Sequence, residues 1–208
     1  MSLHNTSSTI GRDKKQNGFT IVELVLSLTI IGIITTTFYT FFNTSISQYL
    51  SLHRDSLAFG DLATQTQRIG NVLRGLTDIT QASDNDLTAY AYFAPNDTYV
   101  SLVHYYLTDN NTKMKADVTR MTANPPIGTL IAESTKTFNI IDNFYLPSGI
   151  KTFTYYDIAN TLLAAPVADQ HTIRSIKVSL AVPSKSPVVN SSTSMTITVS
   201  LRNRKTNL

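Results

Sequence analysis

Few residues of this 208-residue chain have the types and spacing that catalysis or metal binding requires. There is no cysteine to act as a nucleophile or zinc ligand, and no glycine-rich phosphate loop or nucleophile elbow. The run Asp84-Asn85-Asp86 lacks the following glycine and the distal glutamate of a calcium loop, so we interpret it as a solvated turn. The histidines follow no metal-site spacing; they are His4, His53, His104 and His171. We therefore expect no enzymatic activity, no cofactor and no metal site.

One stretch combines residue types that contact nucleic acid. Aromatic side chains beside cations are what single-strand binders use, and tyrosines here precede lysines and an arginine. The candidates for DNA contact are Tyr105, Tyr106, Lys113, Lys115 and Arg120, with Tyr99 nearby. Tyrosine is also an ordinary strand residue, and Asp109 and Asp117 interrupt the basic run. DNA as a partner is therefore kept as an alternative.

A carboxylate, Glu23, stands directly before the most apolar part of the chain. Residues 24–42 are 19 positions without a charge, in a chain of which 15% is charged. As a helix they would extend roughly 28 Å, close to the ~30 Å hydrocarbon core of a bilayer. A carboxylate at membrane depth costs about 2.5–3.5 kcal/mol, and less near the end of the helix, so Glu23 taken alone is compatible with an incidental charge at the membrane interface.

The flanking charges predict how this span is oriented. Arg12, Lys14 and Lys15 precede it, so the positive-inside rule places the N-terminus in the cytoplasm and the rest of the chain outside. The span is rich in β-branched residues, but lipid enforces a helix, and threonine hydroxyls can bond back to carbonyls one turn earlier. A secretory signal peptide is the alternative; it fits poorly, because the apolar run is long and no small-residue cleavage site follows it.

The helix is free to continue beyond the span, because no proline occurs before Pro95. Apolar residues recur at helical spacing along one face and then, after a slip, along a second. The first face is Ile46, Leu50, His53 and Leu57, and the second is Leu62, Thr66, Ile69, Leu73 and Leu76. We predict one helix from about Phe19 to about Leu76, its second half packed on a globular domain, with His53 as a packed or capping side chain.

After residue 85 the pattern changes to the alternation typical of strands. The predicted strands are residues 87–94, 98–108, 112–121, 150–157, 176–182 and 195–201. The last two should pair antiparallel with one face buried, joined by a polar loop. Asp109-Asn110-Asn111 supplies a turn between the second strand and the third.

The N-terminal region carries a specific motif. A basic leader ending in Lys14-Lys15-Gln16-Asn17-Gly18 is followed by Phe19-Thr20-Ile21-Val22-Glu23-Leu24, and the apolar stretch begins at once. This pattern resembles the N-terminal signature of type IV pilins and pseudopilins. The resemblance implies that a prepilin peptidase and methyltransferase cuts between Gly18 and Phe19 and methylates the new N-terminus of Phe19.

The same resemblance implies how the mature chain assembles. A carboxylate at Glu23 offsets an unfavourable cation at a helix N-terminus, so it could pair with the Phe19 ammonium of its own chain. The resemblance implies that the Phe19 ammonium of a neighbouring subunit takes this place and recruits the subunit. The implied partners are other pilin or pseudopilin subunits, an inner-membrane assembly platform, and the lipid bilayer before assembly. The chain would be a single-pass inner-membrane protein and then part of an extracellular pilus or pseudopilus.

The implied fold is α+β, the type IV pilin fold, in which a long N-terminal helix packs on an antiparallel β-sheet. The expected segments are a cleaved leader, residues 1–18; a transmembrane and assembly half of the helix, residues 19–42; and an extracytoplasmic domain, residues 43–208. Within that domain, the helix is expected to continue over residues 43–77 and the β-rich part to cover residues 86–208.

Two further features indicate the kind of subunit. Thr40 stands where major pilins often have a proline, and a helix that stays continuous suits a minor subunit or pseudopilin. Residues 150–203 resemble the W- and J-type minor pilins and pseudopilins. We therefore expect a minor pilin or pseudopilin of a type IV pilus, a type II secretion system or a competence system. The alternative is a DNA-uptake or adhesive subunit on the same membrane anchor.

Overall fold

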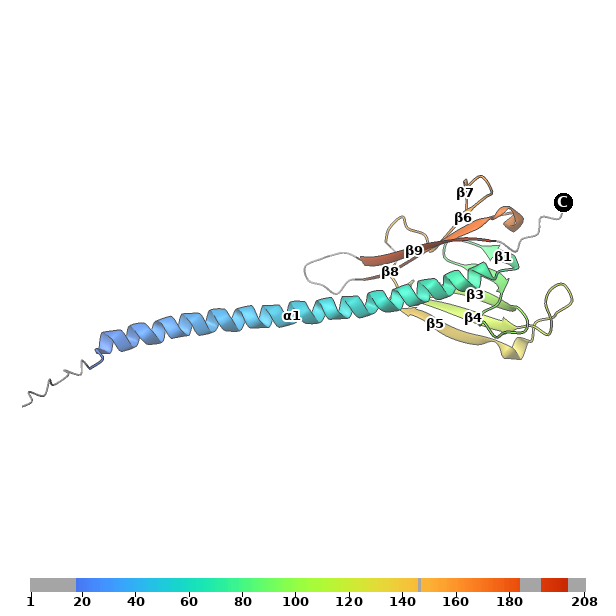
Figure 1. Ribbon diagram of the computed structural model, residues 1–208. Helices are drawn as coiled ribbons and strands as arrows, with labels where there is room; N and C mark the ends of the chain where they lie inside the picture. Colours follow the sequence, from blue (N-terminus) through green and yellow to red (C-terminus); the bar gives the residue numbers. More distant parts are fainter. Residues whose placement is uncertain (1–17, 146, 184–191, 202–208) are drawn as a thin grey trace, which may run out of the picture. The chain divides into compact units, whose positions relative to one another are not determined.

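The computed structural model describes residues 18–145, 147–183 and 192–201 as an α+β protein (Figure 1). One long helix is followed by strands and two short 3₁₀ helices. The elements are α1 Ile21–Arg74, β1 Asp78–Ala82, β2 Leu87–Ala91, β3 Ser101–Thr108, β4 Lys113–Arg120, η1 Ala132–Ser134, β5 Lys136–Asp142, β6 Phe153–Tyr156, β7 Leu162–Leu163, η2 Gln170–Thr172, β8 Ser175–Pro183 and β9 Ser192–Ser200. The predicted long N-terminal helix and antiparallel strands are confirmed.

The strands form two antiparallel sheets instead of the single sheet expected from the sequence. One sheet has the order β1-β2-β3-β4-β5, and the other has the order β7-β6-β8-β9. Phe153 in β6 lies with its ring 6.4 Å from that of Tyr105 in β3, so the inner faces of both sheets meet in one hydrophobic core.

The chain divides into two compact units, Met1–Ser47 and Gln48–Leu208. The first unit contains the apolar part of α1, the one described helix that is long and apolar enough to cross a membrane. Its most apolar window has a mean hydropathy of 2.1, and none of that window is buried. The basic leader residues Arg12, Lys14 and Lys15 lie outside the described residues.

Hydroxyl groups in this part of α1 bond to its own backbone, as predicted. Each donates to the carbonyl oxygen four residues earlier, at 2.8–2.9 Å. The donors are Ser27, Thr29, Thr36, Thr37 and Thr40. These bonds satisfy the hydroxyls without a partner from outside the helix, which makes the segment compatible with hydrocarbon despite its threonines.

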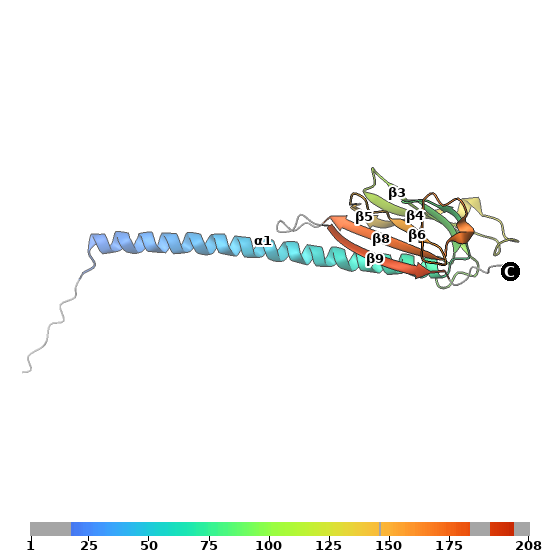
Figure 2. The same cartoon turned by 90° about the horizontal axis from the view of Figure 1, so that it is seen from above.

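The second unit is built around the last turns of α1. The second predicted helix face is buried there, from Leu62 to Leu76. Its residues share a core with apolar side chains of both sheets. Figure 2 shows β8 and β9 running alongside these turns of the helix. α1 ends at Arg74, and Gly75 closes it with backbone bonds to the carbonyls of Asn71 and Val72.

The first predicted helix face is not buried, and this part of the interpretation was wrong. Ile46, Leu50 and Leu57 are 42%, 47% and 63% exposed. His53 is exposed as well, and its ring stacks on Tyr49 at 6.3 Å between centroids. Helical spacing identified a real apolar stripe, but no described strand covers it.

All six predicted strands are present, with altered ends, and the last two pair antiparallel in the order expected. β8 and β9 match at nine successive positions without a register shift. The turn at Asp109-Asn110-Asn111 has three positive φ angles of 53°, 55° and 63°, which aspartate and asparagine tolerate better than most residues. Three strands were missed: β1, β5 and β7.

Gly70 lets α1 and β9 approach closely, and this gives a first prediction. A Cβ at Gly70 would lie 2.7 Å from Cδ1 of Ile197, whereas the next atoms of Ile197 would be 3.7 Å away. Alanine favours a helix interior over glycine by roughly 0.5–1 kcal/mol, but overpacking a core costs about 1–3 kcal/mol. We expect Gly70→Ala to be neutral or destabilising alone, and stabilising by about 0.5–1 kcal/mol when Ile197→Val removes Cδ1.

Denaturant unfolding of the full chain in detergent, for the four members of this double-mutant cycle, measures the coupling. Gly60→Ala is the control, because a Cβ there would meet no atom within 4 Å. An equal effect of Gly70→Ala in both backgrounds would show that the contact with Ile197 does not limit the packing.

Candidate functional site

The candidate site is the N-terminal end of α1, where Gly18, Phe19 and Thr20 lead into the helix. Thr20 caps it: its carbonyl accepts the first helical bond from Leu24 N at 3.1 Å, and its Oγ1 accepts from Glu23 N at 3.3 Å. The sequence Thr20-Ile21-Val22-Glu23 matches the capping-box pattern, of which the structure shows the bond to the threonine hydroxyl; the sequence analysis did not identify this cap.

Gly18 is not required by the fold around it. A Cβ at Gly18 would meet no atom within 4 Å, and Gly18 and Phe19 are both exposed, Phe19 by 72%. The described structure therefore gives no packing reason for a glycine at this position. A residue without a side chain is what a close-fitting enzyme cleft would need, since an extended backbone can then approach the cleft wall.

Glu23 lies exposed in the first turn of α1. A carboxylate there is favoured by the helix macrodipole. No described cation lies within ion-pair distance of it. Its carboxylate is thus available to a cation from another molecule.

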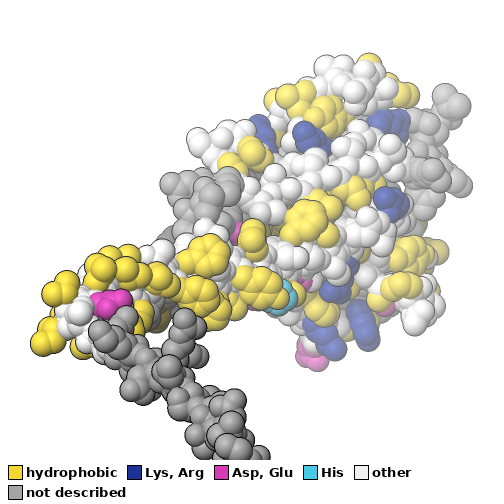
Figure 3. Space-filling view, turned by 60° about the vertical axis from the view of Figure 1, so that its left-hand side comes forward, with side chains coloured by type: hydrophobic (Ala, Val, Ile, Leu, Met, Phe, Trp, Pro, Cys, Tyr) yellow, Lys and Arg dark blue, Asp and Glu magenta, His cyan; other side chains and the backbone are white. Residues whose placement is uncertain are grey.

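The side chains after Glu23 form a continuous apolar surface. Figure 3 shows hydrophobic groups gathered along this part of α1. Its large apolar side chains are between 48% and 82% exposed from Ile21 to Phe42. Such a surface needs either lipid or other protein around it, because it far exceeds the patches that water-soluble monomers expose.

The residues considered for DNA contact do not form one surface. Tyr105 is 2% exposed and lies in the core, so its ring cannot stack on a base, and that part of the interpretation was wrong. Burial raises its pKa. Lys113 pairs with Asp109 at 2.8 Å, and this hydrogen-bonded pair lowers the pKa of Asp109 and raises that of Lys113.

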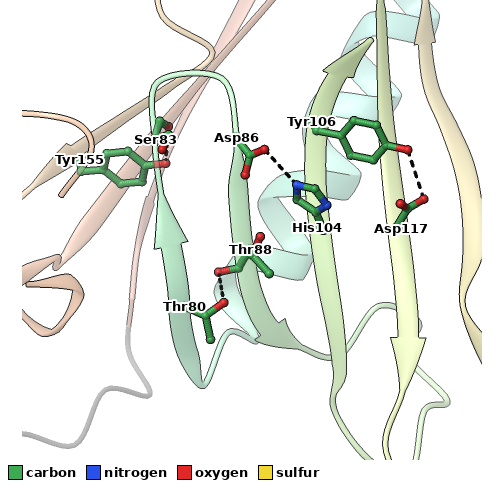
Figure 4. Close-up of polar contacts among 8 residues, drawn as sticks. All are labelled: Thr80, Ser83, Asp86, Thr88, His104, Tyr106, Asp117 and Tyr155. Atoms are coloured by element: carbon green, nitrogen blue, oxygen red, sulfur yellow. Dashed lines mark hydrogen bonds and ion pairs between the residues drawn. The ribbon is translucent and has the colours of Figure 1, made fainter. Parts of the chain in front are cut away.

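Tyr106 and Lys115 are cross-strand neighbours on the outer face of the first sheet, and Arg120 is exposed at the end of β4. In Figure 4 the hydroxyl of Tyr106 points to Asp117, to which it donates at 3.4 Å. Burial and the Asp117 carboxylate raise the pKa of Tyr106. The Tyr106 ring stacks on His104 at 4.8 Å. This face therefore carries the carboxylate of Asp117 together with the cations of Lys115 and Arg120.

The turn Asp84-Asn85-Asp86 is held by other parts of the fold. Asn85 Oδ1 accepts from Oγ1 of Thr152 at 2.9 Å, and Asp84 pairs with Lys151 at 3.0 Å. Asp86 lies 3.0 Å from Nε2 of His104 (Figure 4). These contacts connect the β1–β2 turn to the segment before β6 and to β3. Among the described residues, no group of three or more potential ligands could hold a metal ion.

Removing the cap should weaken the start of α1. Thr20→Val keeps the shape of the side chain but removes the oxygen that accepts from Glu23 N, and loss of an N-cap typically costs about 1 kcal/mol. We expect faster amide hydrogen exchange at Glu23 and Leu24, whose N–H groups bond to Thr20, in the full chain in micelles, and near-normal exchange in Thr20→Ser. Equal exchange in all three proteins would contradict the capping role.

The geometry at this end of α1 agrees with a comparison against known families. The prokaryotic N-terminal methylation motif matches residues 13–39, which include Gly18, Phe19, Glu23 and most of the apolar segment. No curated protein matches the chain. The motif implies processing by a prepilin peptidase and assembly with other pilin subunits, and with the apolar helix it fits a membrane-anchored protein that becomes part of an extracellular filament. The prokaryotic N-terminal methylation motif, followed here by a long apolar helix and antiparallel sheets, supports a type IV pilin or pseudopilin.

Proposed function

We propose that this chain is a minor pilin or pseudopilin, a structural subunit without catalytic activity. The observation that carries the proposal is the methylation motif placed on the start of an apolar helix whose most hydrophobic window is fully unburied. In this proposal the leader is removed between Gly18 and Phe19, and the Phe19 amine is methylated. Residues 24–42 then hold the subunit in the bilayer, with its C-terminal domain outside, until it is extracted into a filament.

The minor role is supported by the continuity of α1 at Thr40. The Thr40 hydroxyl donates to Thr36 O at 2.9 Å within an unbroken helix. A proline at this position would remove a backbone bond and loosen the helix. We propose a W- or J-type subunit, placed near the filament tip of a pilus, a type II secretion pseudopilus or a competence pilus. DNA binding is not proposed, because Tyr105 is buried and Lys113 is paired.

Mass spectrometry of the chain purified from cells that make the filament tests the proposal. The expected product begins at Phe19 and carries one methyl group on its amine. The same preparation, separated into membrane and sheared-filament fractions, should contain the mature chain in both. An N-terminus at Met1, or an unmodified terminus elsewhere, would overturn the proposal.

A further inference from the structure

The free edge of β9 differs from the other sheet edges among the described strands. β9 is the last strand of its sheet and pairs with β8 over nine residues, without a bulge. Its sequence, STSMTITVS, contains no charged residue and no proline. Long, regular, uncharged edges are ready templates for pairing with another chain, and natural proteins usually protect them.

The other three edges show that protection. β1 has five residues and a register shift between Ile79 and Gln81. β5 carries Lys136 and Asp142 at its ends, and its register with β4 shifts opposite Met114 and Lys115. β7 has two residues. Short strands, bulges and charges are the devices that blunt edges, and β9 has none of them.

The hydrogen-bond pattern identifies the groups that β9 presents outward. Leu201 N donates to Arg174 O at 2.8 Å, in the same register as the β8–β9 ladder. Because bonded and non-bonded pairs alternate in an antiparallel ladder, Ile197 and Val199 bond to β8. The N–H and C=O groups of Thr196 and Thr198 therefore point away from β8, and no described residue bonds to them.

A groove lies beside this edge. It has a volume of about 850 Å³ and lies within the unit Gln48–Leu208. Met195 of β9 forms part of its lining, α1 contributes Val72, and the segment after β2 contributes Phe93 and Pro95. A strand added to β9 would place alternate side chains toward the inner face, where this largely apolar groove could receive one of them.

We propose that the β9 edge and this groove receive an extended segment of a neighbouring pilin-like subunit by strand addition. The inference rests on the proposed function, and the choice of occupant follows from α1. The methylation motif at residues 13–39 implies assembly with other pilin subunits, and the groove is lined by residues of the same helix, Val72 among them, so a neighbouring pilin-like subunit is the occupant to which we commit. The uncharged β9 edge suits a segment whose own side chains there are small, hydroxylated or β-branched.

Proline provides the sharpest test, since it removes an outward N–H while leaving the ladder with β8 intact. The full chain, with benzoylphenylalanine in place of Thr198, is irradiated in cells that assemble the filament. We expect a cross-link to a second pilin-like polypeptide. Thr196→Pro should reduce the yield of this cross-link about tenfold, because the hydrogen bond from the Thr196 N–H to the added strand and an adjacent backbone hydrogen bond are lost. Thr196→Val is the matched control, because it also loses the contact between Thr196 and Ser179 hydroxyls but keeps the N–H. We expect it to cross-link within about twofold of the parent.

Processing and abundance of each variant are measured in the same cells. If the parent chain is not cleaved between Gly18 and Phe19, the proposed function fails. If it is cleaved and assembled, but Thr196→Pro cross-links as the parent does, only the strand addition fails. Cross-links confined to the same chain, or to a protein that is not pilin-like, would also overturn it. If Thr196→Pro does not accumulate, the partner cross-linked to the Thr196→Val chain decides: a second pilin-like polypeptide supports the strand addition, whereas no cross-link or a cross-link to any other protein overturns it.

Discussion

Replacing Glu23 with glutamine should leave membrane insertion and cleavage intact and lower filament incorporation by about a hundredfold. Glutamine keeps the length and shape of the side chain while removing its charge. The apolar surface that follows is unchanged, so the span still meets the bilayer as before. The measured quantity is the ratio of mature chain in sheared filaments to mature chain in the membrane fraction.

The expected size of this effect follows from the electrostatics at the helix start. A unit charge pair at 4 Å in an intermediate dielectric attracts by roughly 4 kcal/mol, and 1.4 kcal/mol corresponds to a tenfold change in an equilibrium constant. A carboxylate at the centre of a membrane span costs about 2.5–3.5 kcal/mol, and less near its end. In the proposed mature chain its own Phe19 amine also lies one helical turn from Glu23 and competes for the carboxylate. We therefore assign only part of this attraction to the neighbouring subunit's amine, about 2.8 kcal/mol, which corresponds to the hundredfold loss expected.

Two further variants separate this pairing from other effects of charge. Glu23→Asp keeps the charge on a shorter arm and should recover part of the incorporation. Asp61→Asn removes a charge from an exposed position on α1 beyond the span and should assemble normally. Normal assembly of Glu23→Gln, or an equal loss in Asp61→Asn, would contradict the role proposed for Glu23.

The parts of this fold that were predictable are those fixed by short-range pattern. Residues 24–42 have no charge and Pro95 is the first proline, so composition alone gives an uninterrupted helix, observed as Ile21–Arg74. β8 and β9 alternate because one side faces the core, with Ile176, Val178 and Val199 fully buried. The methylation motif could be identified for the same reason, since Gly18, Phe19 and Glu23 lie within six residues of one another, whereas the roles of these residues stay predictions.

The parts that were missed depend on contacts between distant segments. β5 runs KTFNIID, in which the strict alternation is broken where the register shifts, so a two-residue period does not reveal it. Tyr105 and Tyr106 are adjacent, and the sequence cannot say which ring faces the core; Phe153, 48 positions later, packs against the first. His53 continues an apolar stripe along the helix. The position of the sheets along α1 decides which part of that stripe is covered, and His53 stays exposed.

The domain should lose stability steeply above pH 10, and two buried tyrosines should be the cause. Tyr105 and Tyr155 are 2% and 0% exposed. Burial raises the pKa of both, and the charges of Asp84 and Asp86 raise that of Tyr155 further. The Tyr155 hydroxyl donates to Ser83 O at 2.7 Å, which holds the neutral form in place (Figure 4).

The sign follows from proton linkage. In the unfolded chain a tyrosine titrates near pH 10, whereas in the folded domain these two keep their protons to higher pH. Below pH 10 the tyrosines are protonated in both the folded and the unfolded state, so their contribution to the free energy of unfolding is fully present. Above pH 10 the unfolded state binds fewer protons, so the free energy of unfolding falls by about 1.4 kcal/mol per pH unit for each tyrosine.

Denaturant unfolding of the full chain in detergent between pH 8 and pH 12 measures this slope. Tyr105→Phe and Tyr155→Phe should each lower the slope by about 1.4 kcal/mol per pH unit, and Tyr99→Phe, at a position 43% exposed, should leave it unchanged. Tyr155→Phe should also cost about 1–3 kcal/mol at pH 8, because the Ser83 carbonyl loses its donor. If the free energy of unfolding still falls as steeply with pH in both core variants, the tyrosines that join the two sheets are not the cause. The alkaline loss of stability would then come from the lysines, whose deprotonation breaks ion pairs such as Lys151–Asp84.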